Sequence, residues 1–186
     1  MTVRYFAARL ALMWSCALIA AAVAITPSAA FAKTLQCAPY ARALSGIEIR
    51  GNANSWWTQA EGRYDRGHAP RVGAVLAFAA TARMPLGHVA MVSEVISDRE
   101  ILLTHANWSR PGGIDRNARA VDVSANGDWS EVKVWYAPQG DLGTTAYPTQ
   151  GFIYADPAPT PITGDRDDLG IIIASLDRDS MGGAAL

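Results

Sequence analysis

The sequence predicts an α+β domain in which N-terminal helices pack on an antiparallel sheet of about six strands. Segments of helical character, with residues typical of helix ends, come first, over residues 37–44 and 53–61. After Pro70 the chain changes to short apolar or alternating runs of strand length. A turn at Asp98 and Arg99 joins two of these runs, which indicates an antiparallel hairpin.

Both predicted helices carry signals at their ends. Residues 37–44 are rich in alanine, Pro39 suits a first helical turn, and Gly46 is a typical stop. Residues 53–61 begin beside two asparagines, either of which can serve as the N-cap, and Gly62 ends the segment. We therefore expect two short helices ahead of the sheet.

The predicted strands are either alternating or continuously apolar. Along one of them, His88 and Ala90 fall on one face and Val89 on the other. The set comprises residues 73–78, 87–95, 100–108, 118–123, 132–136 and 152–154.

The chain is expected to divide into three parts, of which the first, residues 1–32, has the features of a secretory signal peptide. A positively charged start precedes a 16-residue run that is apolar except for one serine, and small residues lead up to Ala32. Because a membrane span needs roughly 20 residues, we predict cleavage near Ala32; an uncleaved membrane anchor is the alternative. Residues 33–155 would then be the folded domain.

The third part, residues 156–186, combines three prolines with six acidic and two basic residues. This composition predicts a linker followed by a mostly disordered acidic tail. An apolar stretch at residues 169–176 could instead dock on the domain.

Charge and cysteine content exclude several classes of protein. The chain has 16 Lys and Arg against 17 Asp and Glu, so it lacks the basic excess with which proteins bind a phosphate backbone, and no nucleic-acid partner is expected. Two cysteines form no disulfide framework, and Cys37 alone would remain after export. With three scattered histidines, no metal site or cofactor is expected.

Four residues could carry nucleophilic chemistry. Cys37 lies at the predicted start of a helix, where free N–H groups and the helix dipole favour a thiolate. His88 begins a strand and has the residue type of a general base. His105 and Asn107, two positions apart on the next strand, point to one face. Either could hold the tautomer of His88, and we favour Asn107, because its amide does not titrate.

Several separated motifs occur in order along the chain: Cys37-Ala38-Pro39-Tyr40-Ala41-Arg42, Ser45-Gly46-Ile47, Gly51-Asn52-Ala53 with Trp56-Trp57, Pro70-Arg71-Val72-Gly73, Gly87-His88-Val89-Ala90-Met91-Val92 and Asn107-Trp108. Their order and spacing resemble the CHAP family, the cysteine, histidine-dependent amidohydrolase/peptidase domains. The resemblance covers roughly residues 35–137.

The resemblance implies a papain-like α+β fold and cleavage of peptidoglycan amides, either as an N-acetylmuramoyl-L-alanine amidase or as a peptide endopeptidase. It makes Cys37 the nucleophile and His88 the base, and it places Asn107 where a polar residue orients the histidine or the oxyanion. Many members carry a carboxylate at the position of His105. His105 could replace that carboxylate, or Asn107 could act alone.

The remaining expectations concern substrate and location. Trp108 and Tyr40 could line a groove for glycan or peptide, although both are more often packing residues. Peptidoglycan is the expected partner, and we expect a secreted or periplasmic monomer without stable membrane association. An acyltransferase or transglutaminase on the same two residues, and a non-catalytic wall-binding module, remain the alternatives.

Overall fold

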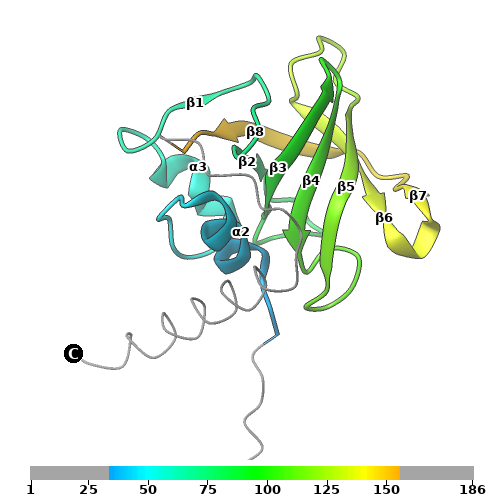
Figure 1. Cartoon of the computed structure of the whole chain (residues 1–186), viewed down its shortest axis with the longest axis horizontal. Helices are drawn as coiled ribbons and strands as arrows, with labels where there is room; N and C mark the ends of the chain where they lie inside the picture. Colours follow the sequence, from blue (N-terminus) through cyan, green and yellow to red (C-terminus); the bar gives the residue numbers. More distant parts are fainter. Residues whose placement is uncertain (1–33, 156–186) are drawn as a thin grey trace, which may run out of the picture. The chain divides into compact units, whose positions relative to one another are not determined.

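The structure is a computed structural model that describes residues 34–155. Helix α2 (Cys37–Ser45), a 3₁₀ turn η1 (Ala53–Ser55) and helix α3 (Trp56–Gln59) precede all the strands of the described residues. The strands are β1 (Arg66–Gly67), β2 (Val75–Phe78), β3 (His88–Ser97), β4 (Glu100–Ala106), β5 (Ile114–Asp122), β6 (Glu131–Tyr136), β7 (Asp141–Leu142) and β8 (Tyr147–Ile153), with a second 3₁₀ turn η2 (Ala137–Gln139) between β6 and β7 (Figure 1).

The sheet closes into a barrel. Its order is β1-β8-β2-β3-β4-β5-β6-β7, every neighbouring pair is antiparallel, and β8 pairs in addition with β6. Strands β8, β2, β3, β4, β5 and β6 therefore form a closed ring. The prediction of a papain-like α+β fold, with helices packed on a sheet, is wrong: this is a closed six-stranded antiparallel barrel with two short helices.

Strand β8 makes this closure possible because it serves two neighbours. Its early residues pair with β6, where Tyr147 faces Val132, and its later residues pair with β2. Gly151, which pairs with Ala77 of β2, has φ of 123°, and a Cβ there would stand 2.6 Å from the carbonyl oxygen of Gly67 in β1. Only glycine fits this close approach. The pairing of β8 with β2 and β6 joins parts of the sheet that local periodicity along the sequence could not reveal.

Most individual segments lie where they were expected. The helix predicted over 37–44 is α2, and Gly46 ends it with φ of 72°. The segment over 53–61 is shorter and divides into η1 and α3. All six predicted strands are present, whereas the two-residue strands β1 and β7 were not predicted.

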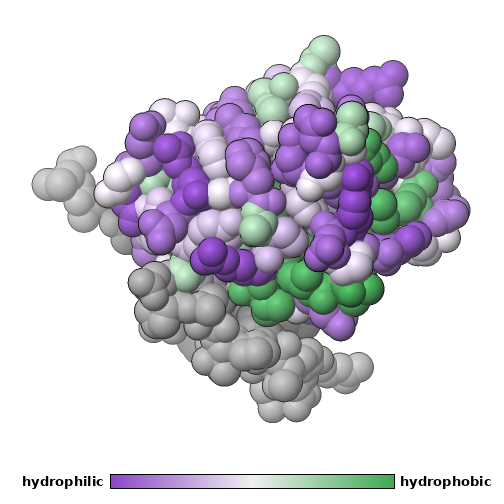
Figure 2. All heavy atoms as spheres, turned by 90° about the horizontal axis from the view of Figure 1, so that it is seen from above, coloured by the Kyte–Doolittle hydropathy of each residue, from purple (hydrophilic) through white to green (hydrophobic). Residues whose placement is uncertain are grey.

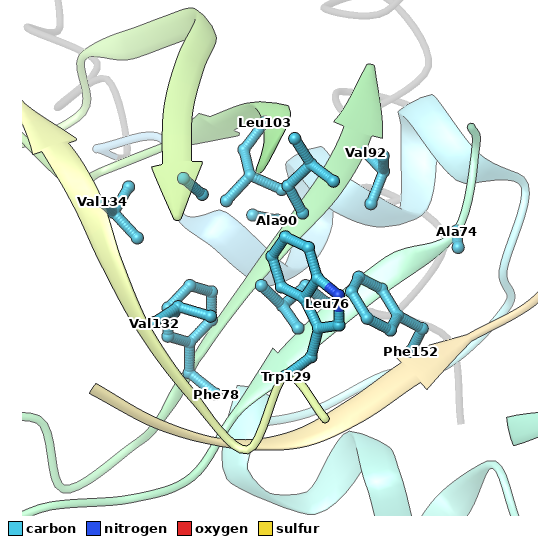
Figure 3. Packing of buried hydrophobic residues seen from close by; sticks show 12 residues of the cluster. Ala74, Leu76, Phe78, Ala90, Val92, Leu103, Trp129, Val132, Val134 and Phe152 are labelled. Carbon is cyan, nitrogen blue, oxygen red and sulfur yellow. The ribbon is translucent and has the colours of Figure 1, made fainter. Parts of the chain in front are cut away.

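Buried apolar residues form an inner core within the barrel and two further clusters outside its wall. Strand β3 divides its side chains between them, with Ala90 in the inner core and Val89 in the core beneath the helices, as the alternation predicted. The inner core, most of which Figure 3 labels, consists of Ala74, Leu76, Phe78, Ala90, Val92, Ile101, Leu103, Ala120, Trp129, Val132, Val134 and Phe152. Helix α2 packs outside the barrel against β3 and β4.

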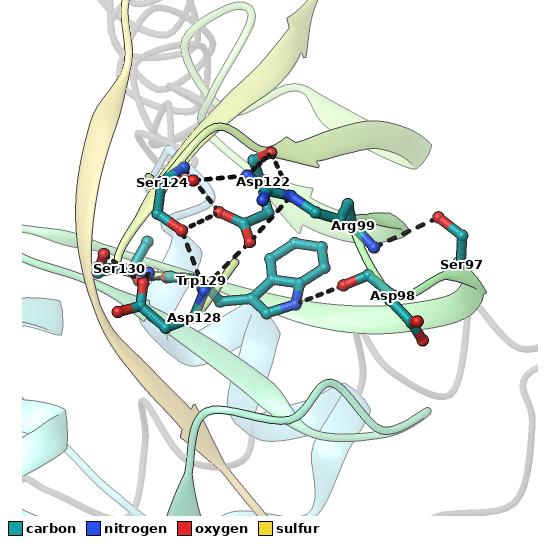
Figure 4. A network of polar contacts seen from close by, with 9 residues as sticks. Ser97, Asp98, Arg99, Asp122, Ser124, Asp128, Trp129 and Ser130 are labelled. Atoms are coloured by element: carbon teal, nitrogen blue, oxygen red, sulfur yellow. Dashed lines mark hydrogen bonds and ion pairs between the residues drawn. The ribbon is translucent and has the colours of Figure 1, made fainter. Parts of the chain in front are cut away.

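A polar network fastens the loop after β5 to the turn between β3 and β4 (Figure 4). The buried carboxylate of Asp122 accepts hydrogen bonds from the backbone and hydroxyl of Ser124 and from the backbone of Trp129. Arg99 lies 3.4 Å from the same carboxylate and also donates to the carbonyl oxygens of Asp122 and Ser124.

The outer surface shown in Figure 2 is mainly hydrophilic with a few apolar patches. Within residues 34–155, no helix has the length and apolar character needed to cross a membrane. The predicted signal peptide, 1–32, and the predicted acidic tail, 156–186, lie outside the described residues, and the domain limits of 33–155 stay a prediction.

Candidate active site

The structure brings His88 and His105 into direct contact. Nε2 of His88 lies 2.9 Å from Nδ1 of His105, and the two rings meet edge to face with centroids 5.1 Å apart. His88 is the first residue of β3, and His105 is the last residue but one of β4. Both side chains are buried, so the protein holds this pair away from bulk water.

Local backbone geometry fixes where His88 begins its strand. Gly87 adopts a φ of 67°, and a Cβ at this position would lie 2.8 Å from the backbone nitrogen of Asn54. A side chain at position 87 would therefore be strained and would clash with backbone. The glycine lets the chain turn tightly into β3 with His88 opposite Phe78 of β2.

Aromatic rings enclose the histidine pair. The ring of Trp108 lies 4.9 Å from His88 and 5.5 Å from His105, and its Nε1 donates to the carbonyl oxygen of Trp135. Phe78 contacts His88 edge to face at 5.4 Å. Trp108 is half-buried, and its ring contacts both imidazoles.

Burial keeps both imidazoles uncharged. Desolvation lowers the pKa of His88 well below its usual 6.5, and the neighbouring His105 lowers it further. Desolvation also lowers the pKa of His105 to about 4, although Asp115 on the adjacent strand opposes the shift. Near neutral pH the contact therefore joins two neutral rings, of which one donates and the other accepts.

The second ring nitrogen of His105, Nε2, is buried and has no hydrogen-bond partner within the described residues. If His88 donates through Nε2, the proton of His105 must lie on this unpartnered Nε2. With its own proton on Nε2, neutral His88 has an unprotonated Nδ1 that can take a proton. A neutral His105 can accept from His88 whether His88 is neutral or charged.

Cys37 is the first residue of α2 and is half-buried. Burial raises the pKa of its thiol, while backbone N–H groups of Val89, Ala38 and Cys37 itself lower it by a smaller amount. The expected net stabilisation of a thiolate at a helix start is therefore wrong, because desolvation is the larger effect. Cys37 packs against the core cluster that contains Val89, the residue that follows His88.

The structure directs Asn107 away from His88. Asn107 lies beyond the end of β4 with a left-handed φ of 61°. Its Nδ2 donates to Oε1 of Gln36, and its Oδ1 accepts from the backbone of Gly112. The preference for Asn107 as the partner of His88 is corrected, because it assumed that the strand continued through residue 107.

The two proposed groove residues have different surroundings. Tyr40 is 2% exposed and packs with Leu44, Met91 and Ala106 between α2 and the barrel. It therefore offers no surface to a glycan or peptide. Trp108 keeps a partly exposed ring, so only Trp108 stays a candidate for substrate contact.

Residues 27–107 match the CHAP domain family model. The resemblance to the CHAP domain family that the motifs indicated is confirmed over these residues. The family is one of cysteine- and histidine-dependent amidohydrolases and peptidases of the peptidoglycan-hydrolase type. The matched segment contains Cys37, His88, His105 and Asn107, whereas β5 to β8 lie beyond it. No curated protein matches the chain.

One residue of this candidate site was not expected from sequence. Gln36 precedes the cysteine and receives the hydrogen bond of Asn107, but no motif marks it. The signal that could have relocated Asn107 was Pro111-Gly112-Gly113, a turn sequence that predicts an earlier end of the strand. Within residues 34–155, no cluster of three or more His, Cys, Asp or Glu residues could hold a metal ion.

Proposed function

We propose that this chain is an exported cysteine hydrolase that cleaves amide bonds of peptidoglycan. Cys37 is the nucleophile, His88 is the base, and His105 holds His88 in the required tautomer. The observation that carries the proposal is the 2.9 Å contact between His88 Nε2 and His105 Nδ1, because it reserves the other nitrogen of His88 for a proton from the thiol. The apolar run and small residues of positions 1–32 support export.

The reaction begins from a neutral thiol and a neutral imidazole. Nδ1 of His88 removes the thiol proton as Cys37 Sγ attacks the carbonyl carbon of the amide, and a tetrahedral oxyanion forms. The raised pKa of Cys37 and the lowered pKa of His88 both disfavour a preformed ion pair. His88 therefore acts as a general base during attack.

Backbone donors stabilise the negative charge that develops. Cys37 and Ala38 are the first residues of α2, whose opening N–H groups have no acceptor within the helix. The Cys37 N–H is a suitable donor for the oxyanion, and a donor of this kind contributes about 3 kcal/mol to transition-state stability in comparable sites. The protonated His88 then gives its Nδ1 proton to the leaving amine, which leaves a thioester on Cys37.

The second half of the reaction repeats the proton transfers with water. His88 Nδ1 takes a proton from a water molecule, the resulting hydroxide adds to the thioester carbonyl, and the Cys37 sulfur leaves and regains the proton. Throughout, His88 Nε2–H donates to His105. Because His105 is uncharged, it positions His88 without offering a negative charge to the imidazolium.

Mass spectrometry of purified peptidoglycan after digestion tests the proposal. Free stem peptides that begin at L-alanine would identify an N-acetylmuramoyl-L-alanine amidase, and shortened stems or split cross-links would identify an endopeptidase. Cys37→Ser should abolish either product. His68→Gln, a change at an exposed histidine outside the site, serves as the matched control. Unchanged peptidoglycan with the wild-type protein would contradict the proposal.

A further inference from the structure

The loop between β4 and β5 contacts the segment that leads into Cys37. Asn107 Nδ2 donates to Gln36 Oε1 at 3.0 Å. Farther along the loop, the Cβ position of Gly112 is 3.0 Å from the Thr34 side chain and 3.5 Å from the backbone nitrogen of Leu35. Residues 34–36 therefore lie against this loop immediately before the nucleophile.

Asn107 is suited to this position in three ways. Its φ of 61° is a conformation that asparagine tolerates better than most residues. Its backbone nitrogen and Oδ1 bind Gly113 and Gly112, so both ends of the loop are held together. Its remaining group, Nδ2, is directed outward to Gln36.

Gln36 does not cap the helix that it precedes. It stands at the N-cap of α2 with extended backbone, yet its side chain makes no capping hydrogen bond. The side chain turns backward instead, with Nε2 donating to the carbonyl oxygen of Thr34 at 3.0 Å and Oε1 accepting from Asn107. The start of α2 is thus tied to β4 through a side-chain bridge.

We propose that the Gln36–Asn107 bridge positions Cys37 for attack, so that the end of β4 supports both reacting residues. His105 holds His88, and Asn107, two residues later, holds the chain before Cys37. Both are positioning residues, and neither exchanges a proton with substrate. This inference rests on the function proposed above, since it assigns the bridge to the same site.

Two variants break the bridge without disturbing the loop. Asn107→Asp keeps an oxygen acceptor for Gly112 and a residue that tolerates the left-handed backbone, but it removes the donor to Gln36. Gln36→Ala removes the acceptor at an exposed position. Each should lower kcat by about tenfold, because small misplacement of reacting groups is costly. KM and the thermal midpoint should be little changed.

Three comparisons separate this role from others. The double variant should lose no more than either single variant, since both remove one interaction. Gln36→Glu, which keeps Oε1 as acceptor, should lose less than Gln36→Ala. The control Asn117→Asp changes an exposed asparagine that is also left-handed, with φ of 51°, but lies within β5; it should leave kcat unchanged.

The pH–rate profile shows through which reacting residue the bridge acts. The acid limb should stay at the wild-type pH in Asn107→Asp and Gln36→Ala, because His88 keeps its partner. Unchanged kcat in both variants would overturn the proposal, and so would a shifted acid limb, which would mean that Asn107 acts through His88.

A readout without substrate keeps the two proposals distinguishable. Backbone amide hydrogen exchange over residues 34–38 should be faster in Gln36→Ala and Asn107→Asp than in wild type and in Asn117→Asp. If wild-type protein leaves peptidoglycan intact, the proposed function fails, while faster exchange would still establish the bridge. Unchanged exchange would overturn the bridge itself.

Discussion

His88 and His105 share a hydrogen bond of 2.9 Å between Nε2 and Nδ1, and both rings are buried in the mouth of the barrel beside Trp108. The histidine proposed as the base thus meets an uncharged imidazole. A carboxylate at position 105 would stabilise the charged form of His88, whereas an imidazole with a pKa of about 4 only accepts a hydrogen bond. The partner therefore influences the pKa of His88 as well as its orientation, in addition to the larger effect of burial.

Replacing His105 should reveal these two effects separately. His105→Leu removes the acceptor that holds His88 in the required tautomer and should lower kcat by on the order of a hundredfold or more, as loss of a triad orienter does. His105→Glu restores an acceptor with negative charge, which should raise the pKa of His88. Because His88 must be neutral to act, the acid limb of kcat/KM should then move to higher pH. An acid limb that stays in place would show that residue 105 does not control His88.

Buried neutral histidines predict sensitivity of the fold to acid. The pKa of His105 is about 4 in the folded protein and 6.5 without burial, so the unfolded chain binds more protons between these values. Stability is therefore complete above about pH 6.5 and falls as the pH drops toward 4, by about 3 kcal/mol for His105 alone. Urea unfolding at several pH values measures this loss.

Two histidine variants provide the comparison for that measurement. His105→Gln removes one titrating ring and should lose less stability on acidification than wild type. His68→Gln changes an exposed ring and should follow the wild-type curve. Identical curves for all three proteins would show that His105 is not held neutral by burial.

Two arginines that form ion pairs should differ in their effect on stability. Arg99 neutralises the fully buried carboxylate of Asp122, whereas Arg119 pairs with Glu100, which keeps part of its surface exposed. Arg99→Ala leaves a buried charge with fewer partners and should cost about 2 kcal/mol of unfolding free energy. Arg119→Ala should cost under about 1 kcal/mol. Equal losses in chemical denaturation would contradict this difference.

The alternation along β3 was readable from sequence because it depends only on neighbouring residues. Val89 and Ala90 lie in different cores, as the period of two predicts. Barrel closure was not readable, since it depends on β8 pairing with both β2 and β6, where Val132 pairs with Tyr147. Helices followed by strands also precede many open sheets, so the order of elements favoured the wrong fold class.

The candidate site also combines features that depend on neighbouring residues with features that depend on tertiary structure. Cys37 and His88 were proposed from residue type and from expected positions at a helix start and a strand start, and the structure places each residue at such a start. The roles of His105 and Asn107 depended on where β4 ends: a strand one residue longer would direct both side chains to one face, but the left-handed backbone at Asn107 separates them. The thiol pKa depended on burial, which tertiary packing decides.

Detection of an acyl-enzyme on Cys37 tests the central claim most directly. Acid quenching of a peptidoglycan digest, followed by intact-mass and peptide mass spectrometry, should show a thioester adduct on the peptide that contains Cys37. The adduct should be absent in Cys37→Ser and should accumulate more slowly in His88→Ala, because His88 activates the thiol. Release of peptidoglycan fragments at the wild-type rate by Cys37→Ser, with no adduct at residue 37, would contradict the account.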